Sequence, residues 1–115
     1  MQNSFTINRR TYPRFRITLS SCCSKSDCNH VIEGQTHDIS TEGICIIADE
    51  ELPAGTWLDI YVKIMDNQEE IHKKGIVIWS NKNDAGRYKI GIKLEGGKLN
   101  PIPIVLRTVK AKNKY

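Results

Sequence analysis

The chain has 115 residues, of which 39% are hydrophobic and 26% charged, and its formal net charge is +4. This length matches one domain with its own core, and the composition excludes a disordered chain. No stretch approaches the roughly 20 apolar residues that cross a bilayer, and the N-terminus lacks the basic-then-apolar order of a secretory signal. We therefore expect a cytoplasmic protein without membrane insertion.

The charge is concentrated at the two ends of the chain. Residues 1–16 carry four arginines and residues 98–115 carry five basic residues, and neither segment contains an acidic residue. The body between them holds eight basic and thirteen acidic residues, which would repel rather than attract a polyanion. We expect an anion site built by one end of the chain, and no nucleic-acid partner.

Taken in chain order, the first periodic run begins at Phe15, where Phe15, Ile17 and Leu19 alternate with polar residues. Alternation with period two predicts a strand. Further short runs rich in β-branched and aromatic residues follow, with polar or Gly-containing breaks between them and no helical pattern. The six predicted strands are 15–22, 30–37, 43–48, 56–64, 72–80 and 87–95.

Strands at such short, regular spacing predict an all-β fold, either an antiparallel barrel or a sandwich. Gly34 suggests a bulge in the second strand. The loop 81–86 is predicted to join the last two strands as a hairpin. After Pro101 and Pro103, the tail is compatible with a short helix.

Four cysteines raise the question of a metal site or a disulfide. Cys22 and Cys23 are adjacent, Cys28 follows, and Cys45 lies in a separate apolar run, so no Cys-x-x-Cys pair exists. Structural zinc sites usually contain such a pair. A cluster of Cys22, Cys28 and His30 is the minor alternative, and we predict reduced, metal-free cysteines and no cofactor.

Two short motifs carry the chemistry. Arg10 and Arg14 lie four residues apart directly before the first strand, and Asp38, Ser40 and Gly43 lie directly before the third. A guanidinium offers planar, forked donors that match a phosphate or the O6/N7 edge of guanine. A carboxylate can accept from the two adjacent N–H donors on the Watson–Crick edge of guanine, which suggests an anionic guanine nucleotide without saying which one.

Within the second motif, Ser40 is predicted to share a strand face with Asp38 and to add a small donor and acceptor. Gly43 would permit a positive φ and a close approach of ligand to backbone. His37 adjoins Asp38, but neighbouring strand residues face opposite sides, so we do not expect the two to act as a pair. Trp79 and Trp57 are predicted to belong to the core rather than to a base-stacking surface.

The order Arg-x-x-x-Arg followed by Asp-x-Ser-x-x-Gly resembles the signature of the PilZ family, bacterial receptors for cyclic di-GMP. Coverage runs from Arg9 to Leu94, and further segments are similar to the motif strand, the fourth strand and the closing hairpin of that family: 38–46, 52–60, 75–80 and 88–94. The family fold, a six-stranded antiparallel β-barrel, agrees with the six predicted strands. Segment 22–30, with its cysteines, departs from the family pattern.

The resemblance implies a role for each motif residue. Arg10 and Arg14, with Arg9 beside them, would clamp the phosphates and guanines of cyclic di-GMP. Asp38 and Ser40 would read a guanine and Gly43 would shape the turn. Gly91 matches a glycine of the last family strand and would line the same surface.

The implied organisation has three parts: an arm, residues 1–14, that is mobile until ligand binds; a barrel, residues 15–97; and a basic tail, residues 98–115. A domain of this size would pass its signal to a separate protein partner. Three other functional classes fit the sequence less well. An enzyme lacks support, because no nucleophile with a positioned base is evident. A PilZ-like interaction module without nucleotide binding would typically lack the arginines. A single-stranded nucleic-acid binder would interleave aromatic and basic residues.

Overall fold

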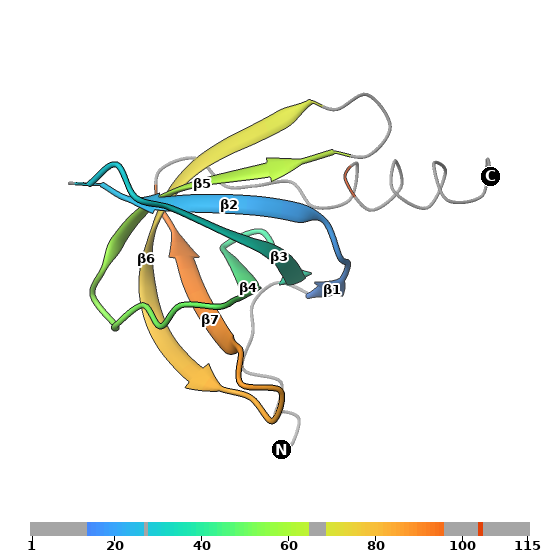
Figure 1. The fold of residues 1–115 in the computed structure, drawn as a ribbon. Helices are drawn as coiled ribbons and strands as arrows, with labels where there is room; N and C mark the ends of the chain where they lie inside the picture. Colours follow the sequence, from blue (N-terminus) through green and yellow to red (C-terminus); the bar gives the residue numbers. More distant parts are fainter. Residues whose placement is uncertain (1–13, 27, 65–68, 96–103, 105–115) are drawn as a thin grey trace, which may run out of the picture.

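The computed structural model describes residues 14–26, 28–64, 69–95 and 104. Within them lie seven strands (Figure 1): β1 Phe15–Arg16, β2 Ser20–Lys25, β3 Val31–Ile39, β4 Gly43–Ala48, β5 Trp57–Lys63, β6 Glu70–Lys82 and β7 Tyr88–Leu94. No helix in this part of the chain has the length and hydrophobicity needed to cross a lipid bilayer.

The strands close into an antiparallel barrel. Each strand pairs with its neighbour in the order β3-β2-β5-β6-β7-β4, and a further pairing of β4 with β3 completes the ring. The short β1 extends the line of β2 along β3, with Phe15 opposite Ile39 and Arg16 opposite Asp38. This arrangement confirms the predicted six-stranded antiparallel barrel, since β1 and β2 together form one side of the ring.

The barrel interior is filled by branched aliphatic side chains. Alternate residues of β4 point inward, and Ile44, Ile46 and Ala48 join one continuous core with residues of the other strands. Ile104 packs against this core from the C-terminal segment and is 5% exposed. The remainder of the predicted tail helix lies outside the described residues. Burial of many branched side chains, each contributing roughly 1.5–3 kcal/mol, is the main stabilising term of such a fold.

The first predicted strand is interrupted rather than continuous. The Thr36 hydroxyl donates to the carbonyl oxygen of Ile17 at 2.5 Å and accepts from the N–H of Leu19 at 2.8 Å. The buried hydroxyl of Thr36 thus satisfies backbone groups of Ile17 and Leu19 that would bond to the backbone of the neighbouring strand in a regular ladder. The inward alternation of Ile17 and Leu19 is nevertheless as predicted, since both are buried.

The bulge in β3 lies three residues beyond its predicted place. Gly34 is in regular register with Ala48, whereas the register between β3 and β4 shifts between Thr36 and Asp38. His37 is the extra residue, so His37 and Asp38 together oppose Cys45. A bulge re-aims side chains and breaks the alternation of faces, and the burial pattern of β3 changes phase at this point. The position of this bulge determines the geometry of the candidate site.

Candidate functional site

A row of five residues crosses the outer face of the barrel. Arg16, Asp38, Cys45, Gly91 and Trp79 are successive register partners on β1, β3, β4, β7 and β6. Several of their neighbours along the strands, such as Ile39, Ile44 and Ile92, belong to the core. Because side chains alternate across a strand, the row faces outward. We call the part of this face formed by Arg14, His37, Asp38, Cys45 and Trp79 the Asp38 surface.

The structure brings Arg14 and Asp38 into direct contact. Arg14 Nη1 donates to Asp38 Oδ1 at 2.5 Å, and the two side chains are 26% and 14% exposed. The Nε of Arg14 is buried and finds no hydrogen-bond partner within the described part of the chain. The guanidinium therefore keeps donor capacity beyond its bond to Asp38. The predicted clamp and the predicted guanine reader are in contact across the site.

This ion pair corrects one expectation. The sequence predicts that Arg14 belongs to a mobile arm, but its side chain forms an ion pair with Asp38 of the barrel. The physical reason is the register of β1, which holds the chain beside the end of β3. Arg9 and Arg10 lie outside the described residues, so the rest of the predicted arm stays a prediction.

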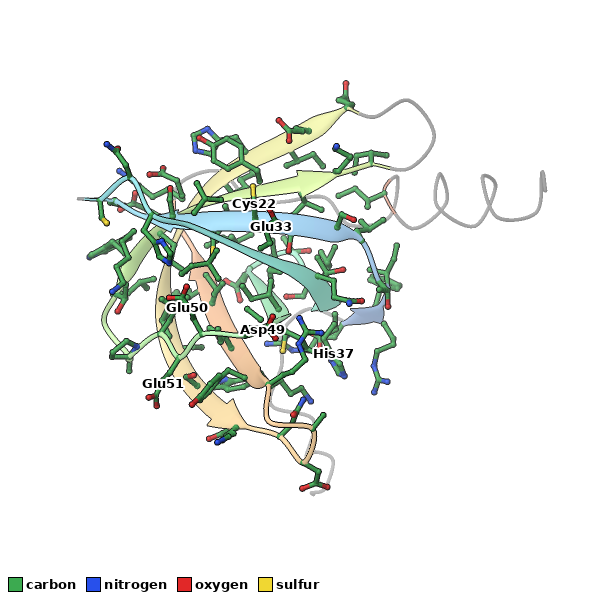
Figure 2. The ribbon with its side chains drawn as sticks, in the orientation of Figure 1. Cys22, Glu33, His37, Asp49, Glu50 and Glu51 are labelled. Atoms are coloured by element: carbon green, nitrogen blue, oxygen red, sulfur yellow. The ribbon has the colours of Figure 1, made fainter. Side chains whose placement is uncertain are left out.

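His37 contacts Asp38 as well, and the expectation that they face apart is wrong. The Nδ1–H of His37 donates to Asp38 Oδ2 at 2.9 Å. The bulge explains the error, since strict alternation fails where one extra residue enters the strand. Figure 2 shows His37 near the end of β3 that lies beside β1. Both oxygens of Asp38 are therefore held by donors, one on each side.

These contacts set the charge state of the carboxyl. Burial acts to raise the pKa of Asp38, but hydrogen bonds from His37 and Arg14, with the charges of both groups, outweigh it and the pKa is lowered. Asp38 is thus a carboxylate near neutral pH, and a carboxylate can only accept hydrogen bonds. An acceptor of this kind suits a ligand edge that presents N–H groups.

Ser40 and Gly43 close the turn between β3 and β4. The Ser40 hydroxyl accepts from the Gly43 N–H at 3.2 Å, and the Ser40 N–H donates to the Gly43 carbonyl at 2.9 Å. Ser40 is buried, at 5% exposure. Its hydroxyl therefore stabilises the turn at the end of β3, the strand that carries Asp38. Its predicted contact with a ligand stays a prediction.

Gly43 is needed for a different reason than predicted. The described glycines with positive φ are Gly55 and Gly86, and Gly43 is not among them. Instead, a Cβ on Gly43 would lie 2.8 Å from the carbonyl oxygen of Ile92 on β7. The close approach is therefore between two strands of the barrel.

Gly91 has a packing role that connects it to Trp79. A Cβ on Gly91 would overlap the indole ring of Trp79, which lies across this position from β6. Trp79 is half-buried and is not part of the interior core. The expectation that Trp79 belongs to the core is therefore wrong, because a bulge between Val77 and Trp79 places it on the outer face. Gly91 contributes to the Asp38 surface by seating an aromatic ring.

Sequence reasoning also missed Cys45. It lies in an apolar run and is 1% exposed. Its sulfur nevertheless lies with the donor atoms of His37 and Asp38, all within 4.8 Å of one another. Burial, together with the charge of Asp38, raises the pKa of the Cys45 thiol to about 11. Its alternation with Ile44 and Ile46 was the available signal that it faces outward.

The minor alternative, a cluster of Cys22, Cys28 and His30, is not assembled among the described residues. Cys22 is the register partner of Glu33, and both lie along β2 and β3 away from His37 (Figure 2). The imidazole of His30 contacts Glu50 at 2.5 Å, while only its backbone N–H reaches Cys28 Sγ, at 3.4 Å.

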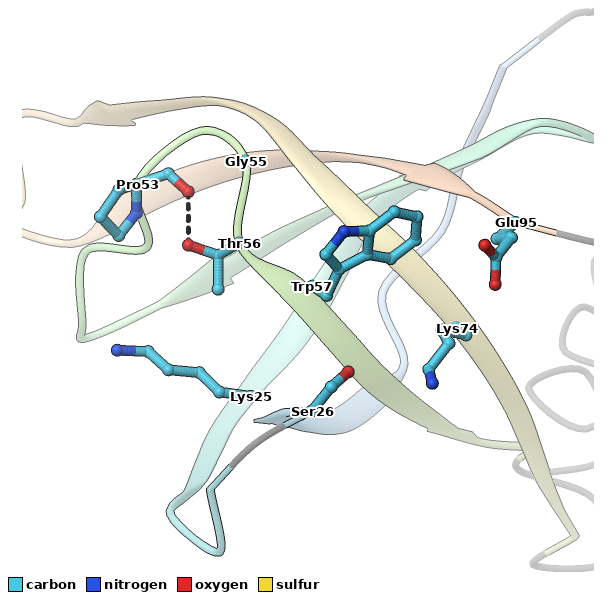
Figure 3. Close-up of a pocket in the computed structure, with 8 residues that line it drawn as sticks. All are labelled: Lys25, Ser26, Pro53, Gly55, Thr56, Trp57, Lys74 and Glu95. Atoms are coloured by element: carbon cyan, nitrogen blue, oxygen red, sulfur yellow. Dashed lines mark hydrogen bonds between the residues drawn. The ribbon is translucent and has the colours of Figure 1, made fainter.

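A cavity of about 650 Å³ opens elsewhere on the barrel, at the turn before β5. We call it the Trp57 cavity (Figure 3), and none of the predicted site residues lines it. Trp57 is 40% exposed there, which also corrects its predicted place in the core. The lining residues are Lys25, Ser26, Pro53, Gly55, Thr56, Trp57, Lys74 and Glu95.

Comparison with known proteins now settles the family. A model of the PilZ domain matches residues 8–101. The chain belongs to the PilZ domain family. PilZ domains are regulatory rather than catalytic. A comparison with curated protein sequences finds no match.

Solved structures agree on the fold. The PilZ domain of YcgR from Escherichia coli, solved with c-di-GMP, is 16% identical with a TM-score of 0.65, covering 93% of this chain and 97% of that one. The inhibitor of motility MotI/DgrA from Bacillus subtilis is 13% identical with a TM-score of 0.68, covering 93% of this chain and 51% of that one. MrkH of K. pneumonia, in complex with c-di-GMP, is 18% identical with a TM-score of 0.63, covering 93% and 51%.

The chain thus spans about half the length of MotI/DgrA and MrkH, and nearly all of the isolated YcgR domain. At identities this low, the structural similarity establishes a shared fold and does not identify the ligand of this chain.

Proposed function

We propose that this PilZ domain binds cyclic di-GMP at the Asp38 surface and passes the signal to a protein partner. The observation that carries the proposal is the meeting of Arg14 and Asp38 on the outer face of the barrel. Family membership and the c-di-GMP complexes of two structural neighbours support the choice of ligand.

In the structure, Arg14 holds the carboxylate that would read a guanine. Binding would exchange this ion pair for two ligand contacts. Asp38 would accept from the N–H groups on the guanine Watson–Crick edge, and the guanidinium of Arg14 would turn to a phosphate or to the O6/N7 edge. An exchange keeps both charges partnered, which avoids the cost of leaving a half-buried charge without a partner.

The remaining motif residues would support this exchange. Arg9 and Arg10 would add cationic donors from the N-terminal arm, which we propose becomes ordered on binding. Ser40 and Gly43 would fix the turn that follows Asp38. Trp79, seated on Gly91, would offer an aromatic face at the opposite end of the row, and aromatic faces stack with nucleobases.

A calorimetric titration with cyclic di-GMP, GTP and a single-stranded oligonucleotide tests the proposal. We expect cyclic di-GMP to bind with low-micromolar or tighter affinity, about −8 kcal/mol. Ligand at ~100 Kd should stabilise the domain by about 2.7 kcal/mol, which a thermal shift would record.

The three ligands separate the rival classes. Heat from GTP at similar affinity would indicate a general guanine-nucleotide site, and heat from the oligonucleotide would indicate nucleic-acid binding. No heat and no thermal shift with cyclic di-GMP at ~100 Kd of the expected affinity would reject the proposal and favour an interaction module without nucleotide binding.

A further inference from the structure

The β3 bulge gathers three metal-ligating groups of different chemistry at one place. A ring nitrogen of His37, a carboxylate oxygen of Asp38 and Cys45 Sγ all lie within 4.8 Å of one another, and Nδ1 is the His37 nitrogen that contacts Asp38. The first two come from the bulge itself, and Cys45 is the register partner of Asp38 on β4. The two strands are hydrogen-bonded neighbours, so the donor atoms are held by a rigid part of the barrel.

The chemistry of this donor set is selective. Imidazole nitrogen, thiolate sulfur and carboxylate oxygen are the three donor types that Zn²⁺ takes in proteins, with bonds of about 2.0–2.3 Å. Hard cations such as Mg²⁺ and Ca²⁺ prefer oxygen alone. Three protein ligands leave a fourth tetrahedral position for water or another small donor. The set therefore favours zinc or a similar borderline metal.

The existing hydrogen bonds show how a metal would be accommodated. His37 Nδ1 and Asp38 Oδ2 are 2.9 Å apart and share one hydrogen, whereas Oδ1 is held by Arg14. A metal between Nδ1 and Oδ2 would take the place of that hydrogen, with the imidazole proton moving to Nε2. Arg14 would remain on Oδ1 as an outer partner of the kind that orients ligating carboxylates.

We propose that His37, Asp38 and Cys45 form a Zn²⁺ site on the Asp38 surface. Binding releases the thiol proton of Cys45 to solvent and forms a zinc–thiolate bond. Two anionic ligands and one neutral imidazole balance the charge of the ion. This site departs from our sequence-based expectation of metal-free cysteines, because that expectation considered spacing along the chain and not the register of β3 with β4.

A consequence follows for the nucleotide, and it rests on the proposed function. Asp38 cannot both ligate zinc through Oδ2 and offer its two oxygens to a guanine edge. Zinc and cyclic di-GMP should therefore oppose each other, and by linkage each should weaken the other by the same factor. We expect at least a tenfold loss of nucleotide affinity when zinc saturates the site.

The direct test is titration of the full, metal-free chain with Co²⁺, a spectroscopic substitute for Zn²⁺. A bound thiolate gives a sulfur-to-cobalt charge-transfer band in the near ultraviolet, and we expect this band to saturate at one equivalent. Zn²⁺, which prefers tetrahedral sites with thiolate and imidazole ligands, should then displace Co²⁺ and remove the band. No band in the wild-type chain would overturn the proposal.

Variants locate the metal. Cys45→Ser should abolish the band, and His37→Gln should weaken cobalt binding at least tenfold while leaving a thiolate ligand. Cys28→Ser and Cys22→Ser are the matched controls, because these cysteines lie outside the cluster, and both should keep the band. A band that survives in Cys45→Ser, or is lost in Cys28→Ser or Cys22→Ser, would assign the metal to another cysteine and overturn the site.

His37→Gln keeps the test decisive if Cys45→Ser does not fold, since His37 is only half-buried. Unchanged cobalt affinity in folded His37→Gln would contradict the site. The cobalt titrations contain no nucleotide, so their failure is distinct from failure of the proposed function. Competition is measured afterwards, by titrating cyclic di-GMP into the apo and zinc-loaded chain. Equal nucleotide affinity in the two would reject the coupling.

Discussion

The Asp38 surface and the Trp57 cavity differ in what they offer a ligand. The Trp57 cavity has a volume of about 650 Å³, and Figure 3 shows the Trp57 ring with Lys25 and Lys74 on either side of it. The Asp38 surface instead joins a forked cation, a carboxylate and an imidazole in direct contact. Lysines are point charges on flexible stems, whereas a guanidinium and a carboxylate match a guanine edge in shape. We therefore base the proposed nucleotide site on convergent polar groups and not on cavity volume.

Removing the carboxylate of Asp38 should cause the largest loss of cyclic di-GMP affinity. Asp38→Ala removes both acceptors for the guanine edge and leaves Arg14 without its partner. Hydrogen bonds to charged groups contribute about 1.5–3 kcal/mol each, so we expect cyclic di-GMP affinity to fall at least about a hundredfold. The measurement is a calorimetric titration of the folded variant.

Trp57→Ala is the matched change in the other region. It removes the exposed ring of the Trp57 cavity and should leave nucleotide affinity within about twofold, since the cavity shares no residue with the Asp38 surface. A larger loss in Trp57→Ala than in Asp38→Ala would reverse the assignment of the two regions.

A smaller effect is expected from Arg14→Lys, which keeps the charge and loses the fork. Nucleotide affinity should fall about tenfold, because a lysine cannot make the paired, planar contacts of a guanidinium. The free domain should lose less than about 1 kcal/mol in the free energy of unfolding, as expected for one partly exposed ion pair. Titration and urea unfolding of the same variant give both values.

Arg87→Lys is the control for that change, because Arg87 also pairs with an aspartate, Asp49, through Nε at 2.8 Å, but elsewhere on the surface. Its nucleotide affinity should match wild type. Wild-type affinity in Arg14→Lys, or a loss of several kcal/mol in its unfolding free energy, would make Arg14 a structural residue rather than a ligand clamp.

The smallest effect concerns pH. The folded-state pKa of Asp38 lies below the ordinary value of 3.8, so its ion pair contributes stability above about pH 4 and loses it as pH falls through the folded pKa. At pH 7 the free energy of unfolding of wild type should exceed that of Asp38→Asn by under about 1 kcal/mol. This difference should shrink below pH 4. Urea unfolding across this range measures it.

The exposed Asp49 supplies the reference for the pH series, since its side chain is 80% exposed. Asp49→Asn should differ little from wild type at any of these pH values. A stability difference for Asp38→Asn that stays constant down to pH 2 would show that the carboxylate charge contributes nothing to the folded state.

Much of the fold was predictable from the sequence because alternation and turn residues are local signals. Ile17 and Leu19 alternate inward as expected, and the six predicted runs correspond to the six sides of the barrel. The split between β1 and β2 was not predictable in this way. It depends on the Thr36 side chain meeting the backbone of a strand far along the sequence.

The candidate site was predictable in part, for a related reason. Arg14 and Asp38 were each predicted as site residues from the motifs, whereas their direct contact depends on the register of β1 with β3. His37 and Trp79 were misplaced because two bulges change which residues face outward. Cys45 lies in the regular strand β4 and was missed although its alternation with the core residues Ile44 and Ile46 indicates the outer face. A bulge depends on the register between two strands, and the hydrophobic periodicity of one strand does not predict that register.

The chain contains two tryptophans, and each belongs to one of the compared regions: Trp79 to the Asp38 surface and Trp57 to the Trp57 cavity. The most direct measurement is therefore a ¹H–¹⁵N spectrum of the two indole N–H signals during titration with cyclic di-GMP, with Trp57→Phe to assign them. We predict that the Trp79 signal shifts progressively to saturation while the Trp57 signal stays in place. A shift of Trp57 alone, or no shift of Trp79 at saturating ligand, would contradict nucleotide binding at the Asp38 surface.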